Sequence, residues 1–279
     1  MKNKFLQLST VALLTGSLFL TSCSKEESST NNSGSNTPNI NFTQSNRALI
    51  IDITGTWCPP CGAYGIPGFN NAVENAKDKT LPLALHSGDP LSLAAMDTIM
   101  VLPKFKSTSV PRIAAGNGLV FPAGVYSDFK ATGQKIVSSV DTFIQNNPFI
   151  VGVKLSNLKV DAVNGSITVD VNAKFFKEVS GEYYIATYFY EDGVISNQKM
   201  SGGPDNANQA HNHVVRAAPK GAWGEVLSIG NSDINKVYSQ SYAYILDSKW
   251  NPSKLAAMAI VWKKNGKDFS YVNGNLIEQ

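Results

Sequence analysis

The chain has 279 residues, with 24 lysines and arginines against 21 aspartates and glutamates, a net charge of +3. This near balance, without a basic patch or interleaved aromatic residues, argues against nucleic acid as a partner. The length predicts about two domains. The chain has only three cysteines, Cys23, Cys58 and Cys61, so any disulfide chemistry depends on very few sulfur atoms.

The first 22 residues have the features of a secretory signal peptide. Two lysines, Lys2 and Lys4, precede an apolar stretch at 5–20, which is too short to span a membrane. The stretch 20–23 resembles the bacterial lipobox, and this resemblance implies that Cys23 becomes the acylated N-terminus after cleavage. The alternative is an ordinary signal peptide with an incidental cysteine. Several acyl chains on Cys23 would give a stable membrane anchor.

Residues 23–46 form the predicted lipidated N-terminus and linker. Serine, threonine, asparagine and glycine dominate from residue 24 onward, and such a segment cannot bury enough apolar surface to fold. The acidic start at 25–27 resembles a signal that sends some lipoproteins to the cell surface, although it can equally be a charged linker. We therefore expect an outer-membrane protein on either the periplasmic or the cell-surface face.

A pair of cysteines follows the first apolar run of the mature chain. The run at 48–54 predicts a buried strand, and a helix is expected at 63–78, so Cys58 and Cys61 lie between a strand and a helix. A helix N-terminus stabilises a thiolate. Cys58 is therefore the expected nucleophile, and Cys61 is placed to resolve the resulting mixed disulfide. Within the mature chain the two can pair only with each other.

Two other roles are possible for these cysteines. A zinc site would need about four ligands and would have to recruit His86, His211 or His213, so we expect no metal. A purely structural disulfide would close a very short loop and remove little chain entropy. We expect His86 to be an ordinary residue at a strand end, and His211 and His213 to form a hydrogen-bonding pair on the surface.

The residues around the dithiol resemble the thioredoxin superfamily. Trp57 directly before the first cysteine is part of that pattern. Asp52 falls where the family keeps a buried acid, which implies that it takes the proton of Cys61. Val110 and Pro111 resemble the cis-proline loop that holds an extended substrate. The resemblance therefore implies that Trp57, Val110 and Pro111 bind substrate.

The predicted first domain, 47–148, alternates strands with helices. We expect strands at 48–54, 81–86 and 111–115 and helices at 63–78, 89–100 and 127–145. This order predicts an α/β, thioredoxin-like domain whose sheet is covered on both faces.

The predicted second domain, 149–279, has the alternating pattern of β-strands. We expect strands at 155–163, 167–175, 183–190, 237–246, 255–263 and 269–272, and a long loop at 196–230. Many strands without a clear helix predict an all-β, immunoglobulin-like antiparallel sandwich. The domain contains no catalytic constellation, but it could recognise a partner at the surface.

Two stretches extend the resemblance to one group. The motif at 52–61 and the phrase His-Asn-His-Val-Val-Arg at 211–216 are similar to the Omp28-related outer-membrane lipoproteins. That resemblance covers both predicted domains and implies a thioredoxin-like domain followed by a β-domain. It does not imply a particular substrate.

These patterns predict a lipid-anchored thiol–disulfide oxidoreductase that acts on protein thiols and disulfides outside the cytoplasm and needs no cofactor. Many relatives with the sequence Trp-Cys-Pro-Pro-Cys are reductants, which favours that direction. The main alternative is a surface binding or adhesion lipoprotein whose thioredoxin-like domain is a scaffold. A peroxidase of the peroxiredoxin type is a third possibility, but the cysteine spacing disfavours it.

Overall fold

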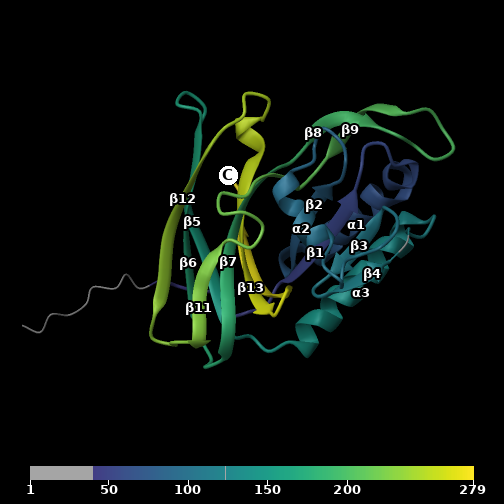
Figure 1. Cartoon of the computed structure of the whole chain (residues 1–279). Coiled ribbons are helices and arrows are strands. Elements are labelled where there is room, and N and C mark those ends of the chain that lie inside the picture. The colour runs from purple at the N-terminus through teal and green to yellow at the C-terminus, as the bar shows by residue number, and fades with distance from the viewer. Residues whose placement is uncertain (1–39, 123) are drawn as a thin grey trace, which may run out of the picture. The chain divides into compact units, whose positions relative to one another are not determined.

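The computed structural model describes residues 40–122 and 124–279. The predicted signal peptide, the lipidation site Cys23 and most of the linker lie outside the described residues. Within them the chain is mostly β-sheet with few helices (Figure 1). None of the described helices is both long and apolar enough to span a membrane. The predicted order of a mixed α/β region followed by a β-rich region is therefore confirmed at this level.

Four strands form the core of the first region. They are β1 (Ala48–Thr54), β2 (Thr80–His86), β3 (Arg112–Ala115) and β4 (Gly118–Phe121). β2 runs parallel to β1, while β3 pairs antiparallel with β1 and β4 pairs antiparallel with β3. All seven residues of β1 and of β2 are buried. Continuous burial is typical of strands covered on both faces, as the apolar sequence predicted.

The helices of this region are α1 (Ile66–Ala76), α2 (Asp97–Met100) and α3 (Phe129–Asn146). A π-helical turn, Cys61–Gly65, leads into α1. α1 and α3 pack against each other (Figure 1), and glycines make this close approach possible. A Cβ on Gly68 would lie 2.4 Å from Thr132, and one on Gly133 would lie 2.2 Å from Asn71. Larger residues at either glycine would force the helices apart.

The helix predicted at 89–100 is wrong for residues 89–93 and begins only at Ala94. Only α2 and a preceding 3-10 turn, Ala94–Met96, are helical. Asp89 does cap a turn, because its Oδ1 accepts from the Leu91 backbone N–H and its carbonyl accepts from the Ser92 N–H. The chain does not continue as a helix from this turn, and the second carboxylate oxygen, Oδ2, contacts Thr56 and His86 near the dithiol.

Ten strands form the second region. They are β5 (Val151–Asp161), β6 (Ser166–Phe175), β7 (Ser180–Glu191), β8 (Val194–Gln198), β9 (Asn206–His211), β10 (Val214–Ala217), β11 (Glu225–Asn231), β12 (Val237–Ile245), β13 (Leu255–Asn265) and β14 (Asp268–Ile277). The long loop predicted at 196–230 is wrong, because β9, β10, β11 and the end of β8 lie there. These strands are short or polar, so their own sequences carried little strand signal.

The strands form three sheets. The largest has the order β14-β13-β7-β10-β2-β1-β3-β4, with β11 also paired to β7. It therefore continues from the first region into the second. The junction is a single parallel pairing, Val214 of β10 with Ala84 of β2. A second sheet has the order β12-β6-β5, and β8 pairs with β9 in a separate two-stranded hairpin.

β7 and β13 have two buried faces. Alternate residues of β13, such as Ala257 and Val261, pack in a core with β5 and β6. The other alternate residues of β13, including Met258 and Trp262, pack in the core that contains β1 and the helices. β7 alternates in the same way. These two strands thus form a wall between two hydrophobic cores.

β14 adds polar links between the regions. The Asn273 side chain donates to Val151 O at 2.9 Å and accepts from the Arg47 backbone N–H at 3.1 Å. The Tyr271 hydroxyl donates to Arg47 O at 2.7 Å, and the Asn117 side chain donates to Tyr271 O at 2.8 Å. The last strand of the chain is therefore fastened to the beginnings of β1 and β5.

Candidate dithiol site

The two cysteines lie where β1 ends and the helical segment begins. Cys58 and Cys61 are joined by a disulfide with an S–S distance of 2.13 Å. Both residues are buried, Cys58 with 2 % of its surface exposed and Cys61 with none. Attack on this disulfide therefore has to come through the small opening at Cys58.

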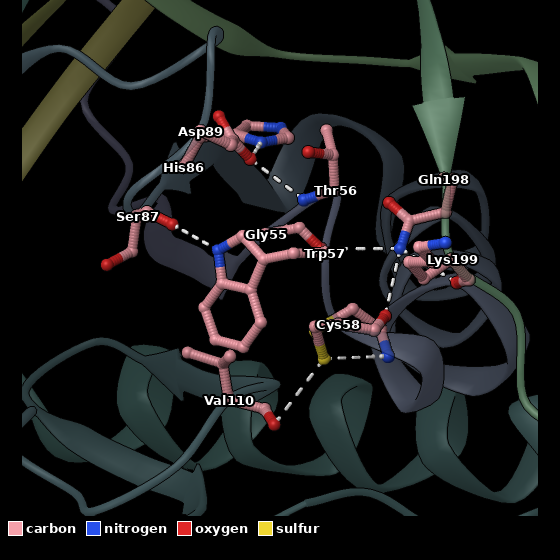
Figure 2. The surroundings of a disulfide bond; sticks show 11 residues. Gly55, Thr56, Trp57, Cys58, His86, Ser87, Asp89, Val110, Gln198 and Lys199 are labelled. Atoms are coloured by element: carbon pink, nitrogen blue, oxygen red, sulfur yellow. Dashed lines mark hydrogen bonds and ion pairs between the residues drawn. A yellow bond between two sulfur atoms is a disulfide. The ribbon is translucent and has the colours of Figure 1, made fainter.

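The surroundings of Cys58 include a backbone donor and a proline loop. The Cys61 N–H lies 3.2 Å from Cys58 Sγ, so it can donate to a thiolate formed there. Cys58 Sγ also lies 3.6 Å from Val110 O (Figure 2). The Val110–Pro111 peptide bond is cis. The structure thus brings together four of the predicted site residues: Cys58, Cys61, Val110 and Pro111.

Trp57 forms part of the exposed rim of the site. Its ring nitrogen donates to Ser87 O at 2.7 Å, so the indole is tied to the end of β2 (Figure 2). A Cβ on Gly55 would lie 2.8 Å from that nitrogen, and glycine therefore leaves room for the ring. With 52 % of Trp57 exposed, the indole offers an apolar surface next to Cys58.

Asp52 is buried inside β1, with 1 % of its surface exposed. Its Oδ1 atom has no hydrogen-bond partner among the described residues. Burial raises the pKa of Asp52 from 3.8 to about 7, because a charged carboxylate loses hydration there. Near neutral pH this group can accept or release a proton. The described structure places no hydrogen bond between Asp52 and either cysteine.

A second carboxylate holds the loop that precedes Cys58. Asp89 Oδ2 accepts from the Thr56 backbone N–H at 2.8 Å and lies 2.7 Å from His86 Nδ1 (Figure 2). Burial raises the pKa of Asp89, but hydrogen bonds from His86, Thr56 and Leu91 outweigh it and leave the pKa below its ordinary value. His86 is at a strand end as expected, yet through Asp89 it supports the dithiol loop.

The expected surface pair of histidines is wrong. His211 ends β9 with 2 % of its surface exposed, and its ring lies 5.0 Å from that of His86. Burial, together with His86, lowers the pKa of His211 to about 4. His213 lies in a turn with a left-handed backbone (φ 56°) and faces Asp192 at 3.1 Å. In residues 40–122 and 124–279, no cluster of three or more His, Cys, Asp or Glu side chains is arranged to hold a metal.

Gln198 is a contact of the dithiol loop that the sequence did not indicate. Its amide nitrogen lies 2.9 Å from Cys58 O and 3.3 Å from Gly55 O. The next residue, Lys199, donates its backbone N–H to Thr56 O at 2.8 Å. These contacts come from the end of β8, about 140 residues away along the chain. The contacts on the dithiol loop are made by backbone carbonyls, which every residue has. The residue types near Cys58 therefore do not predict these contacts.

The fold and the site define a β-rich protein that carries a Cys-Pro-Pro-Cys disulfide after a strand. Residues 141–278 match the family described as "Outer membrane protein Omp28". The chain is thus an Omp28-related outer membrane protein, as the sequence predicted, and its predicted location at the outer membrane agrees with this family.

Solved structures extend the likeness in fold. The structure titled HBP35 of Porphyromonas gingivalis is 15 % identical over 85 % of this chain and 76 % of that chain, with a TM-score of 0.63. A domain of the outer membrane lipoprotein Omp28 from Porphyromonas gingivalis is 16 % identical, covering 48 % of this chain and 91 % of that domain, with a TM-score of 0.32. The first likeness supports the fold over both regions, whereas the second is too low to support an argument. No curated protein matches the chain.

Proposed function

We propose that the protein is a thiol–disulfide oxidoreductase, anchored at the outer membrane through Cys23 and acting on protein thiols and disulfides. The observation that carries the proposal is the Cys58–Cys61 disulfide beside the Val110–cis-Pro111 loop. The order β2-β1-β3-β4, with helices packed on it, supports a thioredoxin-like region. We also propose an immunoglobulin-like sandwich for β5, β6 and β12 against β7 and β13.

The chemistry requires only sulfur and protons. In the reducing direction, the Cys58 thiolate attacks a substrate disulfide, forming a mixed disulfide and releasing one substrate thiolate, which takes up a proton. Cys61 then gives its proton to ionised Asp52 and attacks Cys58 Sγ, and the second substrate thiolate leaves. Two electrons have passed to the substrate, and the Cys58–Cys61 disulfide has formed. A dithiol donor must then reduce it.

The surrounding residues have distinct roles in this proposal. The Cys61 N–H, 3.2 Å from Cys58 Sγ, stabilises the attacking thiolate. Trp57 and Val110 flank the cysteine and would contact the substrate chain, while Pro111 packs against the helical segment, 2.9 Å from where a Cβ on Gly65 would be. Asp52, with its pKa near 7, is suited to receive the proton of Cys61.

The proposal is tested on the whole mature chain with Cys23→Ala, so that only Cys58 and Cys61 remain. Reduction of a disulfide-bonded test protein by a dithiol donor should require both cysteines. Cys58→Ser should abolish turnover, while Cys61→Ser should accumulate the mixed disulfide on Cys58. Turnover that persists in Cys58→Ser would overturn the proposal.

A redox titration of the same chain tests the pair without a substrate. A reversible couple between roughly −270 and −120 mV is the range of known dithiol oxidoreductases, and its position would distinguish reductant from oxidant. A disulfide that stays oxidised far below that range would indicate a structural bridge instead.

One observation favours the alternative of a surface binding protein. A cavity of about 570 Å³ lies between β11 and β12, and at its edge Val226 and Ile229 have 46 % and 65 % of their surfaces exposed. Apolar side chains grouped in this way are typical of interaction surfaces. If the double variant Cys58→Ser, Cys61→Ser keeps the protein's physiological role, this alternative is favoured over the oxidoreductase.

A further inference from the structure

The hairpin of β8 and β9, with its connecting residues 199–205, approaches the dithiol from the second region of the chain. Figure 2 shows Gln198, at the end of β8, directed towards the backbone of Gly55 and Cys58. The neighbouring Lys199 N–H donates to Thr56 O at 2.8 Å.

Gln198 is an unusual choice for this buried place. None of its surface is exposed, and its Oε1 atom has no hydrogen-bond partner among the described residues. Burying an unpartnered amide oxygen is unfavourable, so a methionine or leucine would fill the space at lower cost. What the glutamine adds is its amide donors, and these face the carbonyls of Gly55, Cys58 and Lys199.

The Cys58 carbonyl depends on this contact. Its other described donor is the Gly62 N–H, at the long distance of 3.4 Å, whereas Gln198 Nε2 lies at 2.9 Å. An amide nitrogen has two hydrogens, and three carbonyls lie within its reach. Removing the amide would therefore leave Cys58 O with one weak hydrogen bond and loosen the backbone that carries the nucleophilic sulfur.

The hairpin also touches the helical side of the dithiol. A Cβ on Gly62, directly after Cys61, would lie 2.5 Å from Lys199 O and 2.6 Å from Met200 Sδ. A backbone oxygen cannot move aside as the end of a flexible side chain can. Glycine at this position thus allows the hairpin to close on both cysteines.

We propose that Gln198 is a positioning residue that makes the β8–β9 hairpin a clamp on the dithiol loop. It holds the Cys58 backbone so that Sγ keeps its place beside the Cys61 N–H and the Val110 carbonyl. This inference rests on the proposed function, and it adds that the second region of the chain takes part in the reaction. The clamp acts through Cys58 and does not itself touch the reacting sulfur atoms.

The test compares two glutamines of one hairpin. Gln198→Met keeps the length of the side chain but removes both amide donors. Gln209→Met is the matched control, because the Gln209 amide contacts only Ala210 O and Asn206, within its own strand. Both variants are made in the mature chain with Cys23→Ala, and dithiothreitol serves as electron donor for a disulfide-bonded test protein.

We expect Gln198→Met to lower kcat about tenfold with KM nearly unchanged, because misplacing a reacting group by a fraction of an ångström costs rate rather than binding. The rate at which iodoacetamide alkylates Cys58 in the reduced protein should fall by a similar factor. Gln209→Met should leave kcat, KM and alkylation unchanged. A loss of stability alone would move none of these quantities in the folded protein.

A second variant reaches the clamp from the other side. Gly62→Ala introduces the Cβ that collides with Lys199 O, and it should reproduce the slower Cys58 alkylation of Gln198→Met. If Gln198→Met matches Gln209→Met in kcat and alkylation, or if Gly62→Ala alkylates at the normal rate, the clamp is overturned. Alkylation needs no substrate, so it tests the clamp even if Cys58→Ser were to show that the proposed turnover is absent.

Discussion

β6 and β13 are antiparallel strands of similar length, yet they are buried in different ways. β6 alternates strictly between buried and half-buried residues, whereas the first eight residues of β13 are all buried. β6 covers one core and turns its other face outward. β13 lies between two cores, so both of its faces are apolar. The difference shows that the two regions of the chain share a wall and a sheet and stabilise each other.

The largest test of this shared wall is Trp262→Ala. Trp262 on β13 is fully buried, packs edge-on against Trp223 and donates to the Tyr188 hydroxyl at 3.1 Å. Removing such a side chain costs about 3–5 kcal/mol. Trp262 faces the core that contains β1. We therefore expect the urea midpoint measured by circular dichroism and the midpoint measured by alkylation of Cys58 in the reduced protein to fall together.

Tyr244→Ala on β12 is the control for that substitution. Tyr244 has 38 % of its surface exposed and lies on β12, none of whose residues belongs to the first core. Tyr244→Ala should lower the free energy of unfolding much less than Trp262→Ala does. If Trp262→Ala destabilises the β-rich region while protection of Cys58 stays normal, the wall does not couple the two regions.

The second prediction concerns the charge buried in β1. The folded pKa of Asp52, about 7, lies above its ordinary value of 3.8, so the folded protein holds a proton that the unfolded chain releases in this range. The resulting stability is complete below pH 3.8 and is lost as the pH rises through 7. The loss is on the order of 4 kcal/mol, at about 1.36 kcal/mol per pKa unit.

Asp52→Asn removes this titration. The difference in unfolding free energy between variant and parent, measured in urea from pH 4 to pH 8, should grow in favour of the asparagine variant. Parallel profiles for the two proteins would contradict the raised pKa. A comparison at each pH value also separates Asp52 from the other titrating groups, because these are the same in both proteins.

A third, smaller effect should come from the polar links of β14. Asn273→Ala removes the hydrogen bonds to Val151 O and from the Arg47 N–H, leaving buried backbone groups unpaired at a cost of about 1–3 kcal/mol. Asn265→Ala is the control, because the Asn265 amide contacts only the Ser270 hydroxyl at an exposed turn. Equal unfolding midpoints in urea for the two variants would show that the links contribute little.

The smallest effect is expected within the first region alone. Lys79 forms an ion pair with Asp141 of α3 at 2.8 Å, and the two side chains are 58 % and 39 % exposed. Solvent-exposed pairs contribute about 1 kcal/mol or less. Lys79→Ala should therefore leave the thermal unfolding midpoint almost unchanged, and a shift comparable to that of Asn273→Ala would show that this surface matters more than its exposure indicates.

The sequence predicted those parts of the fold whose signal is local. β1 was identified by its continuous apolar run, because a strand buried on both faces has apolar residues throughout. β6 was identified by its alternation, because a strand buried on one face has an apolar residue at every second position. β9 has the sequence Asn-Ala-Asn-Gln-Ala-His, which has no strand pattern; it is a strand because it pairs with β8. Pairing between segments is not visible in either segment alone, and the predicted loop failed for this reason.

In the candidate site, too, some residues could be predicted from a local pattern and others could not. Cys58, Cys61 and Pro111 were identified from short motifs, and the structure brings them together. Gln198 was missed because it meets carbonyl groups, which every residue has, and because its partners lie far away along the chain. The hydrogen bond from the Thr56 N–H to Asp89 was missed because an aspartate before a proline is more commonly the N-cap of a helix. Side-chain chemistry could be read from the sequence, but its contacts with backbone could not.

The position of β14 at the end of the chain has a consequence for the order of assembly. A chain delivered from its N-terminus makes β1 and both cysteines more than 200 residues before Tyr271 and Asn273 arrive to bond Arg47. Until then, the face of the first core that β13 and β14 cover is open to solvent. The first core therefore remains incomplete on this face until the last strand is in place, and a partly assembled chain presents apolar surface there to chaperones or to other chains.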